Sequence, residues 1–141
     1  DEVIYKPKPS SEKRVLSTET SNKMLALMRA VTKIGTAKIS MRDIEQQVAC
    51  KTGTSNGPRD VSIWCGTPEL VIAIRFGIDD YSVIELPEYM RKASGRTDMQ
   101  VTGGWVAGPL VRKIFDRIYT ERQKVEFSTA VEAELHRILN H

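Results

Sequence analysis

Apolar residues recur with helical spacing over residues 18–35. One set lies three and four positions apart and so shares a helix face: Met24, Leu27, Met28, Val31 and Ile34. Ser17 or Thr18 can cap the start of such a helix, and Gly35 can end it. The pattern predicts a helix over residues 18–35 that buries this stripe.

Residues 47–78 change to the pattern of a three-stranded meander. The strands are expected over 47–55, 60–67 and 70–78, separated by the turn residues Asn56-Gly57-Pro58 and Thr67-Pro68. Short connections make neighbouring strands antiparallel. The third strand is apolar on both faces and needs cover on both sides of its sheet. Its two faces carry Leu70, Ile72, Ile74 and Phe76, and Val71 and Ala73.

Residues 105–141 are expected to contain the C-terminal helices. Gly108-Pro109 can open the first, with proline in its first turn. Ser128 or Thr129 can cap the last, with Glu132 completing a capping box. Their apolar stripes are Leu110, Val111, Ile114, Phe115 and Ile118, and Val131, Leu135, Ile138 and Leu139.

Two segments have less regular patterns. Residues 1–17 place Val3-Ile4-Tyr5 and Arg14-Val15-Leu16 on either side of a proline-containing run, which suits two strands around a stiff loop. Residues 79–104 form a polar segment that is too long to serve only as a connection between two elements, so this loop is either functional or mobile.

The chain of 141 residues is long enough for one domain. The elements together predict an α/β fold of the α+β type, an antiparallel sheet flanked by helices. A net charge of +3 is too small and too evenly spread for a nucleic-acid partner. No apolar run is long enough to span a bilayer, no Cys/His cluster has metal-ligand spacing, and no cofactor is expected.

Cys50 and Cys65 face each other if the first hairpin centres between Gly57 and Pro58. Opposed strand residues lie close enough for a disulfide. A slip of one residue would break the match, so we expect buried free thiols rather than a bond.

Candidate chemistry centres on Lys51-Thr52-Gly53-Thr54. A Lys-Thr-Gly strand is typical of serine acyl-enzymes of the penicillin-recognising kind, where it forms one wall of the active site. Lys51 can supply a cation near a substrate carboxylate, and the hydroxyls of Thr52 and Thr54 can bind that carboxylate. Gly53 lets substrate approach the backbone, and the Thr54 N–H can donate to an oxyanion. We place Ser55 in the same substrate-binding strand.

Residues around this tetrapeptide, over roughly positions 1–120, resemble the C-terminal half of the transpeptidase domain of bifunctional (class A) penicillin-binding proteins. The resemblance rests on landmarks in the family's order: Gly35-Thr36-Ala37, residues 48–55, Arg59-Asp60, residues 67–71, residues 77–80, Thr102-Gly103-Gly104 and Ala107-Gly108-Pro109. It implies a fold like that of serine β-lactamases, with Lys51–Thr54 at the outer edge of a five-stranded sheet and the final helices across one face. An extended peptide can pair with such an edge as an added strand.

The resemblance also implies an activity. Such enzymes crosslink peptidoglycan stem peptides ending in D-Ala-D-Ala through a serine ester, are acylated by β-lactams, and lie outside the cytoplasm on a membrane-anchored parent. They need no cofactor. This chain would contribute Lys51 and Thr54 as catalytic residues and Thr52, Gly53, Thr54 and Ser55 as substrate-binding residues.

Two family motifs are missing and one strand departs from the pattern. No Ser-x-Asn is present, and Ser10-Ser11-Glu12-Lys13 lies in a charged, proline-flanked stretch that reads as a solvated loop. We therefore expect no nucleophile in this chain, and an N-terminal remainder of the domain that supplies it and covers the third strand. Where the family has Trp-Phe after Arg-Asp, this chain has Ser62-Ile63, with Trp64 one place along.

Other residues have structural interpretations. Arg59 and Asp60 are expected to pair and pin the hairpin, and Trp64 and Trp105 to lie in the core or a groove wall. His136 and His141 have no partner at metal spacing. Two other functions stay open: a catalytically dead module that binds peptidoglycan or a partner protein, and a structural fragment that folds by self-association.

Overall fold

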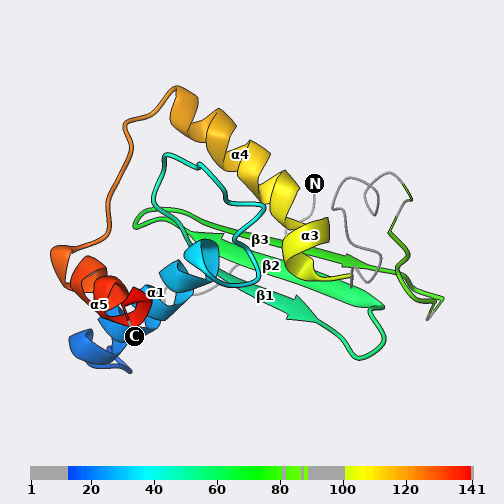
Figure 1. The fold of residues 1–141 in the computed structure, drawn as a ribbon, viewed down its shortest axis with the longest axis horizontal. Coiled ribbons are helices and arrows are strands. Elements are labelled where there is room, and N and C mark those ends of the chain that lie inside the picture. Colours follow the sequence, from blue (N-terminus) through cyan, green and yellow to red (C-terminus); the bar gives the residue numbers. More distant parts are fainter. Residues whose placement is uncertain (1–12, 81, 87, 89–100, 141) are drawn as a thin grey trace, which may run out of the picture.

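The computed structural model describes residues 13–80, 82–86, 88 and 101–140 (Figure 1). Its elements are α1 (Thr18–Lys33), β1 (Ala49–Thr54), β2 (Asp60–Gly66), β3 (Val71–Gly77), α3 (Gly103–Val106), α4 (Gly108–Thr120) and α5 (Thr129–Leu139). The strands form one antiparallel sheet in the order β1-β2-β3. This arrangement confirms the α+β class and the meander, and β1 lies at an edge of the sheet formed by the described strands. The five-stranded sheet that the resemblance implies stays a prediction.

The first hairpin has the register that opposes its two cysteines. Cys50 pairs with Cys65, and Lys51 pairs with Trp64. On the other side of β2, Trp64 pairs with Ala73 of β3. This register fixes which side chains of the three strands share a face, because successive residues of a strand point to opposite faces.

Helices cover both faces of the sheet. Cys50 belongs to a core cluster with Val111 and Phe115 of α4, whereas Ala49 belongs to a second cluster with residues of α1 and α5. Since Ala49 and Cys50 are consecutive in β1, these clusters lie on opposite faces. The expectation that the final helices share one face is therefore wrong: α4 lies on one face, and α5 lies beside α1 on the other (Figure 1).

Helix α1 buries a different stripe from the one predicted. Met24, Leu27 and Ile34 are 50%, 51% and 63% exposed. The residues that it buries are mostly small or polar: Ala26, Arg29, Ala30 and Thr32. Small side chains let α5 approach the helix closely, and a buried ion pair between the two helices determines which side of α1 faces α5.

That ion pair joins Arg29 to Glu132 of α5. Arg29 is 4% exposed, and its Nε lies 2.8 Å from Glu132 Oε1 while Nη2 donates to Oε2 at 3.0 Å. The guanidinium also lies over the Phe127 ring, 5.3 Å from its centroid. Glu132 therefore serves the helix contact rather than the predicted capping box. The Ser128 side chain alone accepts from the Val131 amide at 3.4 Å.

Helix ends mostly follow the predicted signals. Ser17 caps α1 by accepting from the Thr20 amide at 3.1 Å, and the helix ends at Lys33, just before Gly35. Pro109 lies in the first turn of α4, whose buried residues include Val111 and Phe115.

The predicted loops differ in part. The predicted loop over residues 79–104 extends too far at its C-terminal end, because residues from Gly103 onward form α3. Residues 81, 87 and 89–100 lie outside the described part. Arg14-Val15-Leu16 is exposed and forms no strand, so that half of the 1–17 prediction is wrong. Val3-Ile4-Tyr5 and Ser10–Glu12 lie outside the described residues.

A buried hydroxyl contact ties the β2–β3 turn to α4. The Tyr119 hydroxyl lies 2.9 Å from Thr67 Oγ1 and donates to Glu69 Oε1 at 3.1 Å. Thr67 Oγ1 also accepts from the Leu70 amide at 3.2 Å, which closes the turn. Burial is the main cause that raises the pKa of Tyr119 above its ordinary value.

Replacing Arg29 by alanine should lower the free energy of unfolding by about 2–4 kcal/mol, since it removes an ion pair and a cation–π contact and leaves Glu132 unpaired. Urea unfolding measures the change. Arg137→Ala is the matched control, because Arg137 pairs with Glu134 on the exposed side of α5, and its cost should stay below about 1 kcal/mol. Equal costs would contradict the importance of the buried pair.

The raised pKa of Tyr119 predicts an alkaline loss of stability. Above the ordinary tyrosine pKa of about 10, the unfolded chain releases this proton before the folded chain does, so stability falls as pH rises. Urea unfolding from pH 8 to 11 should show wild type losing stability relative to Tyr119→Phe. Tyr5, Tyr81 and Tyr89 are common to both proteins, so their titration cancels. Parallel pH profiles would contradict the prediction.

Candidate functional site

Strand β1 divides the candidate residues between two faces. Thr52 and Thr54 follow Cys50 at intervals of two and share its face, whereas Lys51 and Gly53 alternate with them on the other. The two hydroxyls predicted to bind a carboxylate therefore point to one side. The Lys51 side chain starts from the opposite side.

The pairing pattern decides which backbone groups of β1 reach the open edge. Opposed residues alternate between hydrogen-bonded and non-hydrogen-bonded positions. The Ser55 amide donates into β2 at 2.9 Å, whereas the Cα atoms of Cys50 and Cys65 lie only 4.1 Å apart, the spacing of a non-hydrogen-bonded pair. The N–H and C=O groups of Thr52 and Thr54 therefore point away from β2, to the edge.

Lys51 reaches this edge despite its starting face. Its exposed side chain curls back so that Nζ donates to the Thr52 carbonyl at 2.6 Å. That carbonyl is one of the outward-pointing groups of β1. The ammonium thus lies at the edge to which the backbone N–H of Thr54, the predicted oxyanion donor, also points.

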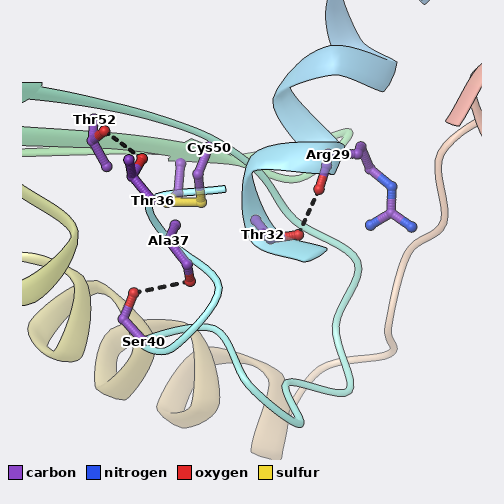
Figure 2. The surroundings of a disulfide bond; sticks show 8 residues. Arg29, Thr32, Thr36, Ala37, Ser40, Cys50 and Thr52 are labelled. Atoms are coloured by element: carbon purple, nitrogen blue, oxygen red, sulfur yellow. Dashed lines mark hydrogen bonds between the residues drawn. A yellow bond between two sulfur atoms is a disulfide. The ribbon is translucent and has the colours of Figure 1, made fainter. Parts of the chain in front are cut away.

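The Thr52 hydroxyl has a partner that the sequence analysis did not assign to the site. Thr36 Oγ1 lies 2.6 Å from Thr52 Oγ1, and Figure 2 shows the two side chains pointing toward each other. Thr36 lies in the turn that follows α1, within the Gly35-Thr36-Ala37 landmark. In the sequence, the one signal that could have indicated this contact was the position of Thr36 just after a predicted helix C-terminus.

Two other motif residues have structural roles in the hairpin. A side chain on Gly53 would place its Cβ 2.5 Å from Ser62 Oγ, so Gly53 makes room for the Ser62 side chain of the neighbouring strand. Ser55 Oγ accepts from the amides of Arg59 and Asp60 at 3.1 and 2.9 Å, which fixes the turn. The Ser55 hydroxyl is therefore already used within the hairpin.

The predicted partner of Asp60 is not the one described. Asp60 Oδ1 lies 2.6 Å from Arg75 Nη2, across the β2–β3 pair. The carboxylate thus joins two strands, where we expected it to meet its neighbour Arg59. Asp60 therefore has the structural role predicted for it, with Arg75 as its partner.

Cys50 and Cys65 form a disulfide directly before Lys51 (Figure 2). The expectation of free thiols is wrong, because the register has no slip and opposes the two residues. Both cysteines are fully buried in the cluster shared with α4. The bond ties the edge strand to the centre of the sheet.

Helix α3 lies against the backbone of this site. A Cβ on Gly103 would come 1.8 Å from the Ser62 carbonyl oxygen, and one on Gly104 would come 2.1 Å from that of Thr36. Only glycine permits this approach. The pair Gly103-Gly104 was visible in the sequence, but its partner surfaces were not.

Two hollows involve residues discussed above. One, of about 170 Å³, is lined by Thr36, Trp105 and four neighbours, namely Gly35, Ile39, Ser40 and Gly104. The other, of about 330 Å³, is apolar and lies on the opposite face, where Trp64 forms part of its wall and is 58% exposed. Both tryptophans therefore line grooves, and Trp64 does not belong to the core.

No group of three or more potential metal-binding side chains occurs among the described residues. None of the described helices combines the length and apolar character needed to cross a bilayer. His136 contacts Asn140 on the surface of α5, and His141 lies outside the described residues.

Comparison with known proteins finds no family model, no curated protein and no solved structure that matches the chain. The resemblance to penicillin-binding proteins therefore stays a prediction.

Reducing the disulfide should lower the free energy of unfolding by about 3 kcal/mol, because the bond closes a loop with a sequence separation of 15. Urea unfolding with and without dithiothreitol measures the change. The double variant Cys50→Ala/Cys65→Ala is the control, whose stability dithiothreitol should leave unaltered. An unchanged wild-type midpoint after complete reduction would contradict the prediction.

Proposed function

We propose that these residues form the C-terminal part of a penicillin-binding D,D-transpeptidase, with the fold of that family and of serine β-lactamases. The observation that carries the proposal is the edge of β1, where the Lys51 ammonium and the Thr54 N–H lie, together with the hydroxyls of Thr52 and Thr54 on the adjoining face of the strand. An extended stem peptide has the geometry to add to this edge as a strand. The nucleophilic serine and the Ser-x-Asn motif come from an N-terminal remainder of the domain.

The chemistry is an acyl transfer. The serine oxygen attacks the carbonyl between the two terminal D-alanines, the C–N bond breaks, and D-alanine leaves as the amine takes a proton. The amine of a second stem peptide then attacks the ester, forms the new amide and releases the serine. A β-lactam enters by the same first step, with its ring C–N bond opening.

Three residues of β1 contribute to this reaction. The hydroxyls of Thr52 and Thr54 bind the terminal carboxylate, and Lys51 adds positive charge beside it. The Thr54 N–H donates to the carbonyl oxygen as negative charge develops. For Lys51 to act, its ammonium exchanges the Thr52 carbonyl for the carboxylate, which needs only a rotation of an exposed side chain.

The disulfide supports the proposed extracytoplasmic location. Such bonds persist in oxidising compartments and are rare in the cytosol. Peptidoglycan crosslinking by a membrane-anchored parent takes place in such a compartment. The location belongs to the same proposal and is tested with it.

Labelling by a fluorescent penicillin tests the proposal in the natural polypeptide that carries these residues. The label is expected on a serine outside residues 1–141, located by peptide mass analysis. Lys51→Met should slow acylation at least tenfold, whereas Lys113→Met, a lysine on the exposed side of α4, should leave it unchanged. Label on Ser10 would contradict the assignment of the nucleophile. Absence of label would favour the catalytically dead binding module.

A pair of variants at Thr54 isolates the oxyanion donor. Because the Thr54 amide points to the edge, proline there removes the donor without breaking a bond of the sheet. Thr54→Pro should slow acylation about 10²–10³-fold relative to Thr54→Ala, which keeps the amide. Urea unfolding of both variants shows that the strand is intact. Equal rates would contradict the role of the Thr54 amide.

A further inference from the structure

The contact between Thr36 and Thr52 joins two segments of the chain at the rim of a cavity. Their hydroxyl oxygens lie 2.6 Å apart, a normal length for an O–H···O hydrogen bond. Thr36 also lines the hollow of about 170 Å³ whose wall includes Trp105. Thr36 therefore connects the edge strand, through Thr52, to the wall of this space.

The proton count of this pair limits what it can offer to a ligand. Each threonine hydroxyl carries one proton and can accept two hydrogen bonds. One of the two protons lies between Thr36 and Thr52, so a single proton stays available for an outside acceptor. Accepting a bond from one hydroxyl polarises the other and strengthens its donation. The pair thus acts as one oriented donor.

Both members of the pair are attached to rigid parts of the fold. The Thr36 carbonyl lies against Gly104 of α3, where even a methyl group would not fit. The next residue, Ala37, is fully buried, and its amide donates to the Val31 carbonyl at 3.2 Å. Thr52 follows the disulfide-linked Cys50 by two positions. The hydroxyls meet because their backbones are fixed.

We propose that Thr36 donates to Thr52 and is thereby a positioning residue, which leaves the Thr52 hydroxyl proton directed toward the terminal carboxylate of a bound peptide. This inference rests on the proposed function, which makes Thr52 a carboxylate ligand. Without Thr36, the Thr52 side chain keeps its hydroxyl, but the direction of its proton is no longer set. Carboxylate recognition then weakens while the fold stays intact.

Three variants test this role in the natural polypeptide that carries these residues. Thr36→Val removes the hydroxyl with little change in shape, and Thr36→Ser restores it. Thr20→Val is the matched control, because the Thr20 hydroxyl accepts from Ser17 in a similar exposed pair at the far end of α1. The probes are acetyl-lysyl-D-alanyl-D-alanine and its C-terminal amide, titrated while the Thr52 methyl signal is followed by NMR.

Wild type is expected to bind the carboxylate form at least tenfold more tightly than the amide. Thr36→Val should reduce this preference about fivefold or more, Thr36→Ser should keep it within twofold, and Thr20→Val should leave it unchanged. A purely structural role for Thr36 would weaken both peptides equally, and that result would overturn the proposal. An unchanged preference in Thr36→Val would overturn it as well.

Failure of the two proposals can be told apart. If wild type prefers the carboxylate and Thr36→Val does so equally, the role of Thr36 is wrong while carboxylate recognition by β1 stands. If wild type shows no preference, carboxylate recognition itself is wrong and Thr36 has nothing to orient. Acylation by penicillin is measured separately and decides whether the domain is a transpeptidase.

Discussion

The register between β1 and β2 is the constraint on which the candidate site depends. It opposes Cys50 to Cys65 and so allows the disulfide. The same register makes Thr52 and Thr54 non-hydrogen-bonded positions, whose backbone groups face the edge. A shift by one residue would separate the cysteines and turn the Thr54 amide into the sheet. One pairing thus sets both the stability of the strand and its chemistry.

The residues of the Lys51–Thr54 motif have structural and functional interpretations at once. Gly53 makes room for Ser62, and the Lys51 ammonium satisfies a carbonyl of its own strand. Each contact would be useful in a plain hairpin. The Thr36–Thr52 contact is different, because it lies outside the hairpin and beside a cavity. It is the feature that distinguishes this edge from an ordinary one.

Much of the fold could be predicted from local patterns. Strand alternation, the turn residues and the cap at Ser17 each depend on neighbours in the sequence, and the strands and helices follow them closely. The buried face of α1 could not be predicted, because Arg29 is buried by a partner far along the chain. The strand that carries the site was predicted. The contacts of Thr36 and α3 with this strand were not, because tertiary packing brings them there. The Gly103-Gly104 pair was only a landmark of the resemblance, and its close contact with the strand backbone could not be predicted.

The contact between α1 and α5 has a consequence for the order of folding. Arg29 and Glu132 are 103 residues apart in the sequence, whereas the strands of the meander pair with immediate neighbours. Contacts between distant residues form late, because closing a long loop costs more chain entropy. On the ribosome, the meander is complete well before α5 has emerged. Until then, Arg29 of α1, which is buried in the folded chain, stays exposed. We therefore expect docking of α1 onto α5 to be the last step of folding during synthesis. We also expect chaperones to bind most readily to a chain that is stalled before residue 128.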